Sequence, residues 1–260
     1  MDAKEFGRRW RLDGRRAVVT GATKGIGRAV AEELCGLGAE VLIAARDPEG
    51  VGRAVEEMRA AGHRAHGVAA DVGTSEGRRL VLAGAESLLG GADILVNNAG
   101  TNIRKRALDY TEDEYEFLLR TNMTSAFELS RMFHPSLKEG GAGSVVNVVS
   151  VAGLVSVGTG VVYAMTKAAL IQMTRSLAAE WGPDGVRVNA VAPWFTRTPL
   201  TEPVLGRDEF RARVVARTPL GRVAEPEEVS GVVAFLCLPV ASYVTGQCVA
   251  PDGGFLAHGL

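Results

Sequence analysis

The chain has 260 residues, of which 47% are hydrophobic and 23% charged, the balance of an ordinary globular protein rather than a disordered one. Its 29 Lys and Arg residues nearly cancel its 30 Asp and Glu residues, so the formal net charge is -1. Without a basic surplus to bind a phosphate backbone, we expect no nucleic-acid partner. Cys35, Cys237 and Cys248 are far apart and form no CxxC pair, so we expect neither a disulfide framework nor a metal site.

The first residues predict no targeting segment. Residues 1–16 are polar and charged, without the apolar stretch of a signal peptide, and Asp2 and Glu5 argue against a transit peptide. No window contains the ~18 apolar residues that a membrane helix needs. We therefore expect a cytoplasmic protein without a membrane partner, in which residues 1–12 are a polar lead-in.

Short runs rich in Val and Ile alternate with amphipathic segments along the chain. This pattern predicts strands at residues 17–20, 40–45, 64–69, 93–97, 144–150, 186–192 and 247–250. It predicts helices at 25–37, 48–61, 74–89, 111–120, 122–139, 162–181 and 226–238, with 194–225 irregular or short-helical. The alternation is typical of a parallel sheet covered on both faces. We expect one α/β domain over residues 1–260, a doubly wound (Rossmann) seven-stranded sheet with its ligands at the carboxyl ends of the strands.

A glycine-rich turn lies between the first predicted strand and the first predicted helix. It reads Thr-Gly-Ala-Thr-Lys-Gly-Ile-Gly over residues 20–27. Gly21 can form the tight turn, Gly25 lets the backbone approach a pyrophosphate, and Gly27 lets the helix pack against the sheet. The helix N-terminus then offers free N–H groups and the positive end of its dipole. A merely flexible turn is the alternative, but the strand–turn–helix context favours phosphate binding.

The spacing T-G-x-x-x-G-x-G resembles that of the short-chain dehydrogenase/reductase family. Further motifs of this family follow in order: Asp71-Val72, Asn97-Asn98-Ala99-Gly100, Asn122, Ser150, and Tyr163 with Lys167 in a Y-x-x-x-K pattern. Segments 174–181, 186–194, 218–222 and 228–247 are similar to those of plant-type tropinone reductases. The resemblance implies that Asn122, Ser150, Tyr163 and Lys167 are catalytic. It also implies cofactor contacts by Gly21, Thr23, Lys24, Gly25, Ile26, Gly27, Arg46, Asp71, Val72, Asn98, Ala99, Gly100, Tyr163, Lys167, Pro193, Phe195, Thr196 and Thr198.

The catalytic residue types fit proton transfer at a carbonyl. Tyr163 and Lys167 are four positions apart, so they share one face of a helix. A nearby ammonium favours the phenolate, so we expect Lys167 to lower the pKa of Tyr163, which then acts as general acid or base. Ser150 can donate to the same substrate oxygen. In the family the lysine also binds the nicotinamide ribose, and the asparagine holds a water that links the lysine to solvent.

The end of the second predicted strand indicates which dinucleotide is used. Enzymes that use NAD place an acid there to bind the ribose hydroxyls, whereas this chain has Ala45 followed by Arg46. Arg46 and Lys24 can pair with a 2′-phosphate, so we expect NADP(H). Asp47 lies two positions past the place of the acid, and a solvated loop charge remains the alternative interpretation of Arg46.

The substrate side is predicted from position alone. We expect contacts from Ser150, Val151, Val157, Tyr163, Trp194 and Leu200, with residues 195–220 as a lid. Trp194 replaces the glycine that is common in the family, and it can line the pocket or reshape the cofactor edge. The apolar side chains suggest a small or medium hydrophobic ketone or alcohol. Tropinone is disfavoured because no carboxylate lies between Ser150 and Tyr163 to meet its cation, although Glu202 on the lid remains a candidate.

Three functions remain open. The first is an NADP(H)-dependent oxidoreductase that interconverts a ketone and its secondary alcohol. The second is a 3-oxoacyl-carrier-protein reductase, for which Arg104, Lys105 and Arg106 offer a basic patch. The third is a non-catalytic dinucleotide sensor. The predicted helices at 122–139 and 162–181 carry more apolar residues than one sheet contact needs, and the family resemblance implies a homodimer or homotetramer.

Overall fold

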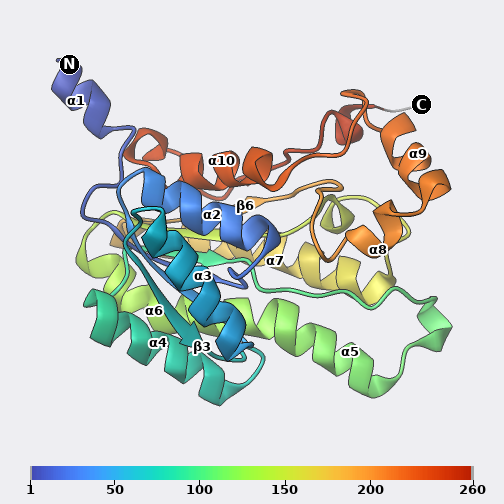
Figure 1. Ribbon diagram of the computed structural model, residues 1–260, viewed down its shortest axis with the longest axis horizontal. Helices are drawn as coiled ribbons and strands as arrows, with labels where there is room; N and C mark the ends of the chain where they lie inside the picture. The colour runs from blue at the N-terminus through green and yellow to red at the C-terminus, as the bar shows by residue number, and fades with distance from the viewer. Residues whose placement is uncertain (1, 259–260) are drawn as a thin grey trace.

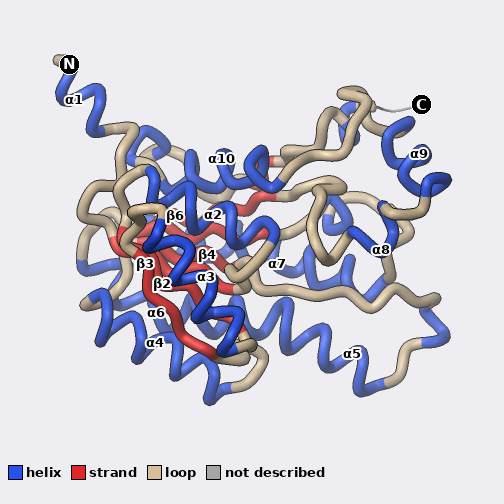
Figure 2. The backbone as a smooth tube through the Cα atoms, in the orientation of Figure 1, coloured by secondary structure: helices blue, strands red, loops and turns tan. Residues whose placement is uncertain are grey.

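The computed structural model describes residues 2–258 and contains one seven-stranded parallel sheet in the order β3-β2-β1-β4-β5-β6-β7. This confirms the predicted doubly wound sheet (Figure 2). The connection from β3 to β4 crosses from one half of the sheet to the other, and the strand order reverses between β1 and β4, which pair directly. Ligands of such sheets bind beside this switch point. The strands are β1 (Arg16–Thr20), β2 (Glu40–Ala45), β3 (Ala65–Ala69), β4 (Ile94–Asn97), β5 (Gly143–Val148), β6 (Val186–Val191) and β7 (Cys248–Val249).

Helices cover both faces of the sheet (Figure 1). Successive side chains of β1 explain the two cores, because Val19 packs with one face and Val18 with the other. The first core joins α2 (Gly25–Gly36), α3 (Pro48–Ala60) and α10 (Pro226–Cys237). The second joins α4 (Ser75–Leu89), α6 (Ser125–Glu139) and α7 (Val161–Trp181). The remaining α-helices are α1 (Ala3–Arg8), α5 (Glu112–Leu119), α8 (Glu202–Leu205) and α9 (Asp208–Ala216).

The structure differs from the sequence prediction in two places. Residues 3–8 of the expected lead-in form α1, and Leu12 is 1% exposed within the first core, so the lead-in ends before Leu12. The expected start of a helix at Asn122 is instead the middle of a π-helical turn, η2 (Arg120–Thr124), that joins α5 to α6. The prediction that 194–225 is irregular or short-helical is confirmed: the segment contains the short helices α8 and α9, which stand at the end of the molecule opposite α1 (Figure 1).

No helix within residues 2–258 is both long and apolar enough to cross a membrane.

Candidate active site

The glycine-rich turn is fixed to the end of β4 by side-chain hydrogen bonds. The Asn98 amide donates to the carbonyl oxygens of Thr20 and Gly21, at 2.9 and 3.0 Å. The Thr20 hydroxyl in turn accepts from the backbone N–H of Asn98 and of Ala99. A Cβ at Gly27 would overlap the Asn98 amide nitrogen and the Gly21 carbonyl oxygen. Only glycine at this position lets the first turn of α2 pack so closely against β4, and this leaves the helix N-terminus open to a phosphate.

A cleft runs from this turn across the ends of β2, β3 and β4. Arg46 and Lys24 both line this cleft and are exposed to solvent, whereas Ala45, at the end of β2, is half-buried. Asp71 accepts from the backbone N–H of Gly73, which holds its carboxylate at the edge of the cleft. The structure brings together here the predicted residues Gly21, Thr23, Lys24, Gly25, Ile26, Gly27, Arg46, Asp71, Val72, Asn98, Ala99, Gly100 and Thr198.

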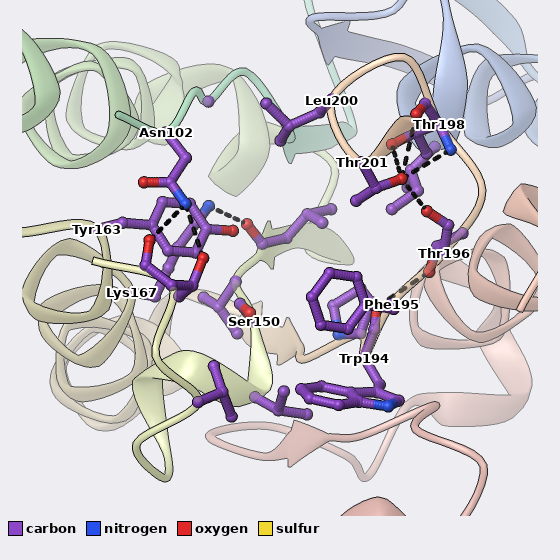
Figure 3. Close-up of a pocket in the computed structure, with 18 of the residues that line it drawn as sticks. Asn102, Ser150, Tyr163, Lys167, Trp194, Phe195, Thr196, Thr198, Leu200 and Thr201 are labelled. Atoms are coloured by element: carbon purple, nitrogen blue, oxygen red, sulfur yellow. Dashed lines mark hydrogen bonds between the residues drawn. The ribbon is translucent and has the colours of Figure 1, made fainter. Parts of the chain in front are cut away.

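A second cavity adjoins the cleft and contains the predicted reacting groups. The cleft and the cavity share several lining residues, among them Ile26, Asn98 and Gly100, so a ligand can extend from one into the other. Figure 3 shows Ser150, Tyr163 and Lys167 on one side of this cavity, with Leu200, Thr198 and Thr201 across from them. The predicted residues Ser150, Val151, Val157, Tyr163, Lys167, Pro193, Trp194, Phe195, Thr196, Thr198 and Leu200 all line it.

Burial sets the protonation of Tyr163. It raises the pKa of the phenol above its usual value, although the Ser150 hydroxyl and the positive charge of Arg104 act to lower it. The expected net lowering of this pKa is therefore wrong, because burial outweighs the nearby positive charges. The Lys167 Nζ lies 5.5 Å from the centre of the Tyr163 ring and donates to the Val148 carbonyl oxygen at 2.9 Å. A neutral phenol is the form that can donate a proton to a carbonyl oxygen.

Lys167 is 4% exposed, and desolvation lowers its pKa to about 8. Asn122 lies behind it and is 1% exposed. The Asn122 side chain forms two hydrogen bonds with the backbone of Thr101: its Oδ1 atom accepts from the N–H at 2.8 Å, and its Nδ2 atom donates to the carbonyl oxygen at 2.9 Å. A Cβ at Gly100 would lie 3.4 Å from both the Asn122 Oδ1 atom and the Lys167 Nζ atom. Asn122 therefore does not line the cavity in the structure; it holds the chain after β4 against Lys167 through a π-helical turn, a geometry frequent at functional sites.

Trp194 forms part of the cavity wall and also joins three segments. Its ring stacks on Phe255 with centroids 3.8 Å apart, and its Nε1 atom donates to the Thr218 hydroxyl at 3.0 Å. Phe195 meets it edge-on at 4.7 Å and packs against Phe210 of α9. The residue that replaces the common glycine therefore connects the segment after β6 to α9 and to the C-terminal segment.

Six further residues line the cavity without having been predicted as site residues: Asn102, Arg104, Val148, Val149, Thr159 and Thr201. The Asn102 amide donates to the carbonyl oxygen and the hydroxyl of Thr159, at 2.9 and 2.8 Å (Figure 3). Arg104 was expected only as part of a surface patch. The signal that could have placed Asn102 and Arg104 is proximity, since they lie two and four positions after Gly100 in the chain.

Comparison with known proteins agrees with this geometry. The profile of a family described as Enoyl-(Acyl carrier protein) reductase matches residues 21–256. A tropinone reductase homolog of Arabidopsis thaliana is 48% identical over 98% of this chain and 97% of its own length. The chain belongs to the short-chain dehydrogenase/reductase family. It is an oxidoreductase of that family, and its tropinone reductase-like character, suggested by the sequence, is confirmed.

Two solved structures of short-chain dehydrogenases/reductases show the same fold with a dinucleotide bound. A gluconate 5-dehydrogenase from Burkholderia cenocepacia, in complex with NADP and tartrate, is 31% identical with a TM-score of 0.93, covering 98% of this chain and 100% of its own. L-Sorbose reductase from Gluconobacter frateurii, complexed with NADPH and L-sorbose, is 30% identical with a TM-score of 0.89, covering 96% of this chain and 99% of its own.

The buried Lys167 predicts a pH-dependent stability. Because the pKa is about 8 when folded and 10.5 in the usual range, the folded protein binds fewer protons than the unfolded one between these values. The cost of the buried charge, on the order of 3 kcal/mol, is fully present below pH 8 and disappears as the pH rises toward 10.5. We expect Lys167→Met to be more stable than wild type in urea at pH 7, with a smaller gain at pH 9.5. An equal gain at both pH values would contradict the assignment.

Proposed function

We propose that the protein is an NADP(H)-dependent oxidoreductase that interconverts a ketone and its secondary alcohol. The ketone is small or medium in size and has a mainly hydrocarbon skeleton. The observation that carries this proposal is the junction of two features in one continuous cavity. One is a phosphate-binding turn whose glycine packing leaves the N-terminus of α2 open. The other is the group formed by Ser150, Tyr163 and Lys167 beside it. The gluconate 5-dehydrogenase and L-sorbose reductase structures, crystallised with NADP and NADPH, support the choice of cofactor.

The residues of the chain have separate tasks in this reaction. When bound, the nicotinamide supplies or accepts the hydride. The Ser150 hydroxyl donates to the carbonyl oxygen of the substrate and holds it in place. The Tyr163 hydroxyl gives its proton to that oxygen during reduction and takes it back during oxidation. Lys167 holds its ammonium close to the phenol, where a positive charge stabilises the phenolate that proton transfer leaves.

The experiment that tests this function is a panel of ketones with NADPH, and of alcohols with NADP. The apolar wall formed by Val157, Trp194 and Leu200 favours substrates with a hydrocarbon body. We expect amines such as tropinone to be poor substrates, because no acidic side chain lines the cavity and Glu202 is exposed outside it. Failure of every ketone to oxidise NADPH would contradict the proposal.

A 3-oxoacyl-carrier-protein reductase is the second candidate within the same reaction class. Its predicted basic patch is divided in the structure. Lys105 pairs with Glu114 at 2.6 Å, and α5 begins with the acidic residues 112–114, which disfavour an acidic carrier at this face. An acetoacetyl thioester assayed beside the simple ketones separates the two candidates, since faster turnover of the thioester would favour the carrier substrate.

We propose that Arg46 and Lys24 read the 2′-phosphate of the cofactor. Neither side chain has a hydrogen bond or ion pair to another residue in the described chain, so both remain available. Arg46→Asp is expected to lower the NADPH preference over NADH at least tenfold, because an acid repels the phosphate and accepts from the ribose hydroxyls. Arg53→Asp, on the exposed face of α3 and outside the cleft, is the matched control. An unchanged preference in Arg46→Asp would exclude this role.

We propose that residues 195–220 form a lid over the substrate. Leu205, Val214 and Val223 form a small apolar core of their own, packed by Trp194 and Phe195 and separate from the two main cores. A segment with its own core can shift as a unit on a fixed base. Within the segment, the Thr201 hydroxyl donates to the carbonyl oxygens of Thr196 and Thr198, so these residues move together.

We propose that the protein assembles through α6 and α7. Phe127 and Met165 are 44% and 47% exposed on these helices, next to the side that packs on the sheet. We expect light scattering at micromolar concentration to give a dimer or tetramer, and Phe127→Asp to shift it toward smaller species. Leu88→Asp, at an equally exposed position on α4, is the control. A wild-type mass near the 27.4 kDa of one chain would refute the proposal.

A further inference from the structure

An arginine lies in the wall of the catalytic cavity without a partner. Arg104 lines the cavity together with Ser150 and Tyr163. Its positive charge acts on the Tyr163 phenol, which places the guanidinium within electrostatic reach of the reacting oxygen. Arg104 makes no hydrogen bond or ion pair with another residue in the range 2–258, whereas the adjacent Lys105 is paired with Glu114.

The surroundings of Arg104 are built for an anion. Arg104 is an exposed residue at the mouth of the cavity, but packing around the guanidinium is enough to lower its pKa, and no carboxylate of the described residues lies there to compensate the charge. None of the residues that line the cavity is acidic. A partly desolvated cation without a counter-charge gains most from an anionic ligand, and a carboxylate matches the planar guanidinium with two parallel hydrogen bonds.

The loop that carries Arg104 is held before any ligand arrives. Asn102 is bonded to Thr159 through two hydrogen bonds, at 2.9 and 2.8 Å. The Tyr110 hydroxyl donates to the carbonyl oxygen of Ile103, the residue just before Arg104, and Lys105, just after it, donates to Glu114. Because the neighbours of the arginine are held in this way, binding does not need to order the loop, and less affinity is lost.

We propose that Arg104 binds a carboxylate of the substrate, so that the preferred ketones are keto acids with an apolar chain and the preferred alcohols are the corresponding hydroxy acids. The proposal rests on the carbonyl reduction inferred above. The ketone oxygen lies against Ser150 and Tyr163, the hydrocarbon body contacts Trp194 and Leu200, and the carboxylate pairs with Arg104. No bond other than those of the carbonyl reduction changes.

Matched pairs of ketones test the subsite. The probes are 4-oxopentanoate, 5-oxohexanoate and 6-oxoheptanoate, each assayed with NADPH against its neutral methyl ester. We expect at least one acid to exceed its ester in kcat/KM by about 10- to 100-fold, the range for a charge-assisted contact. The preference should decrease as ionic strength rises. Using the ratio of acid to ester cancels any effect of Arg104 on the proton transfer itself.

The variants are Arg104→Gln and, as a matched control, Arg106→Gln, an exposed arginine that does not line the cavity. Arg104→Gln should bring the acid-to-ester ratio close to one, mainly by raising KM for the acid, whereas Arg106→Gln should leave it unchanged. A wild-type ratio near one for all three pairs, or a preference that survives Arg104→Gln, would overturn the subsite.

A binding measurement separates this proposal from the proposed function. If no ketone is reduced although NADPH binds, carbonyl reduction fails, and the three carboxylates are titrated calorimetrically into NADPH-loaded protein. Binding to wild type that is lost in Arg104→Gln supports the subsite. No binding to wild type, or equal binding to both proteins, overturns it.

Discussion

Tyr163→Phe should lower kcat by about 10²- to 10⁴-fold, the usual contribution of a positioned general acid. The substitution removes one hydroxyl from the wall of the catalytic cavity and keeps the ring beside Lys167. Because burial keeps the phenol protonated, Tyr163 is the residue that can deliver a proton during reduction. Steady-state kinetics with the best ketone of the panel measures the loss, and fluorescence titration with NADPH should show binding within a few-fold of wild type.

The matched control is Tyr243→Phe, which removes the hydroxyl of a fully exposed tyrosine outside the cavity and should leave kcat unchanged. Wild-type turnover in Tyr163→Phe would contradict the acid–base assignment. A wild-type protein that binds NADPH but turns over no ketone or alcohol would instead favour the dinucleotide sensor.

Gly27→Ala should weaken NADPH binding by tens-fold or more and lower the thermal midpoint. A Cβ at this position would overlap the Asn98 amide nitrogen and the Gly21 carbonyl oxygen, the two groups that fix the phosphate-binding turn. Overpacking of this kind costs about 1–3 kcal/mol, and here the strain falls on the ligand-binding backbone itself. Titration with NADPH and thermal unfolding measure the two effects.

Gly36→Ala provides the control within the same helix. Gly36 has no atom within 4 Å of the added Cβ, so alanine should retain NADPH affinity and gain up to about 1 kcal/mol from its better helix propensity. If the two variants bind NADPH equally well, the close packing at Gly27 does not control the turn.

The fold and the order of the catalytic motifs could be predicted because both depend on patterns within short stretches of the sequence. The run 41–44 of β2 is buried on both sides, which leaves it uniformly apolar in sequence. The residues of the phosphate-binding turn lie within eight positions, and Tyr163 and Lys167 lie one helical turn apart. The sheet then brings these distant motifs to the same edge, as its strand order requires.

Other properties of the site depend on contacts between distant segments. The π-helical turn at Asn122 is stabilised by the backbone of Thr101, which no local pattern around 122 indicates. The upward shift of the Tyr163 pKa follows from burial. The lack of an ion-pair partner for Arg104 also depends on the folded structure. The nearby carboxylate of Glu114 pairs with Lys105, which the sequence around Arg104 does not indicate.

Transfer of isotope from cofactor to substrate tests the central claim most directly. The purified protein is incubated with NADPH in which both hydrogens at the nicotinamide C4 position are deuterium and with the best ketone of the panel, and the product is examined by mass spectrometry. If the protein reduces carbonyl groups as proposed, the product is an alcohol with one deuterium on its carbinol carbon, formed together with one equivalent of NADP. Binding of the cofactor without label in any alcohol, across the neutral ketones, the keto acids and the thioester, would contradict it.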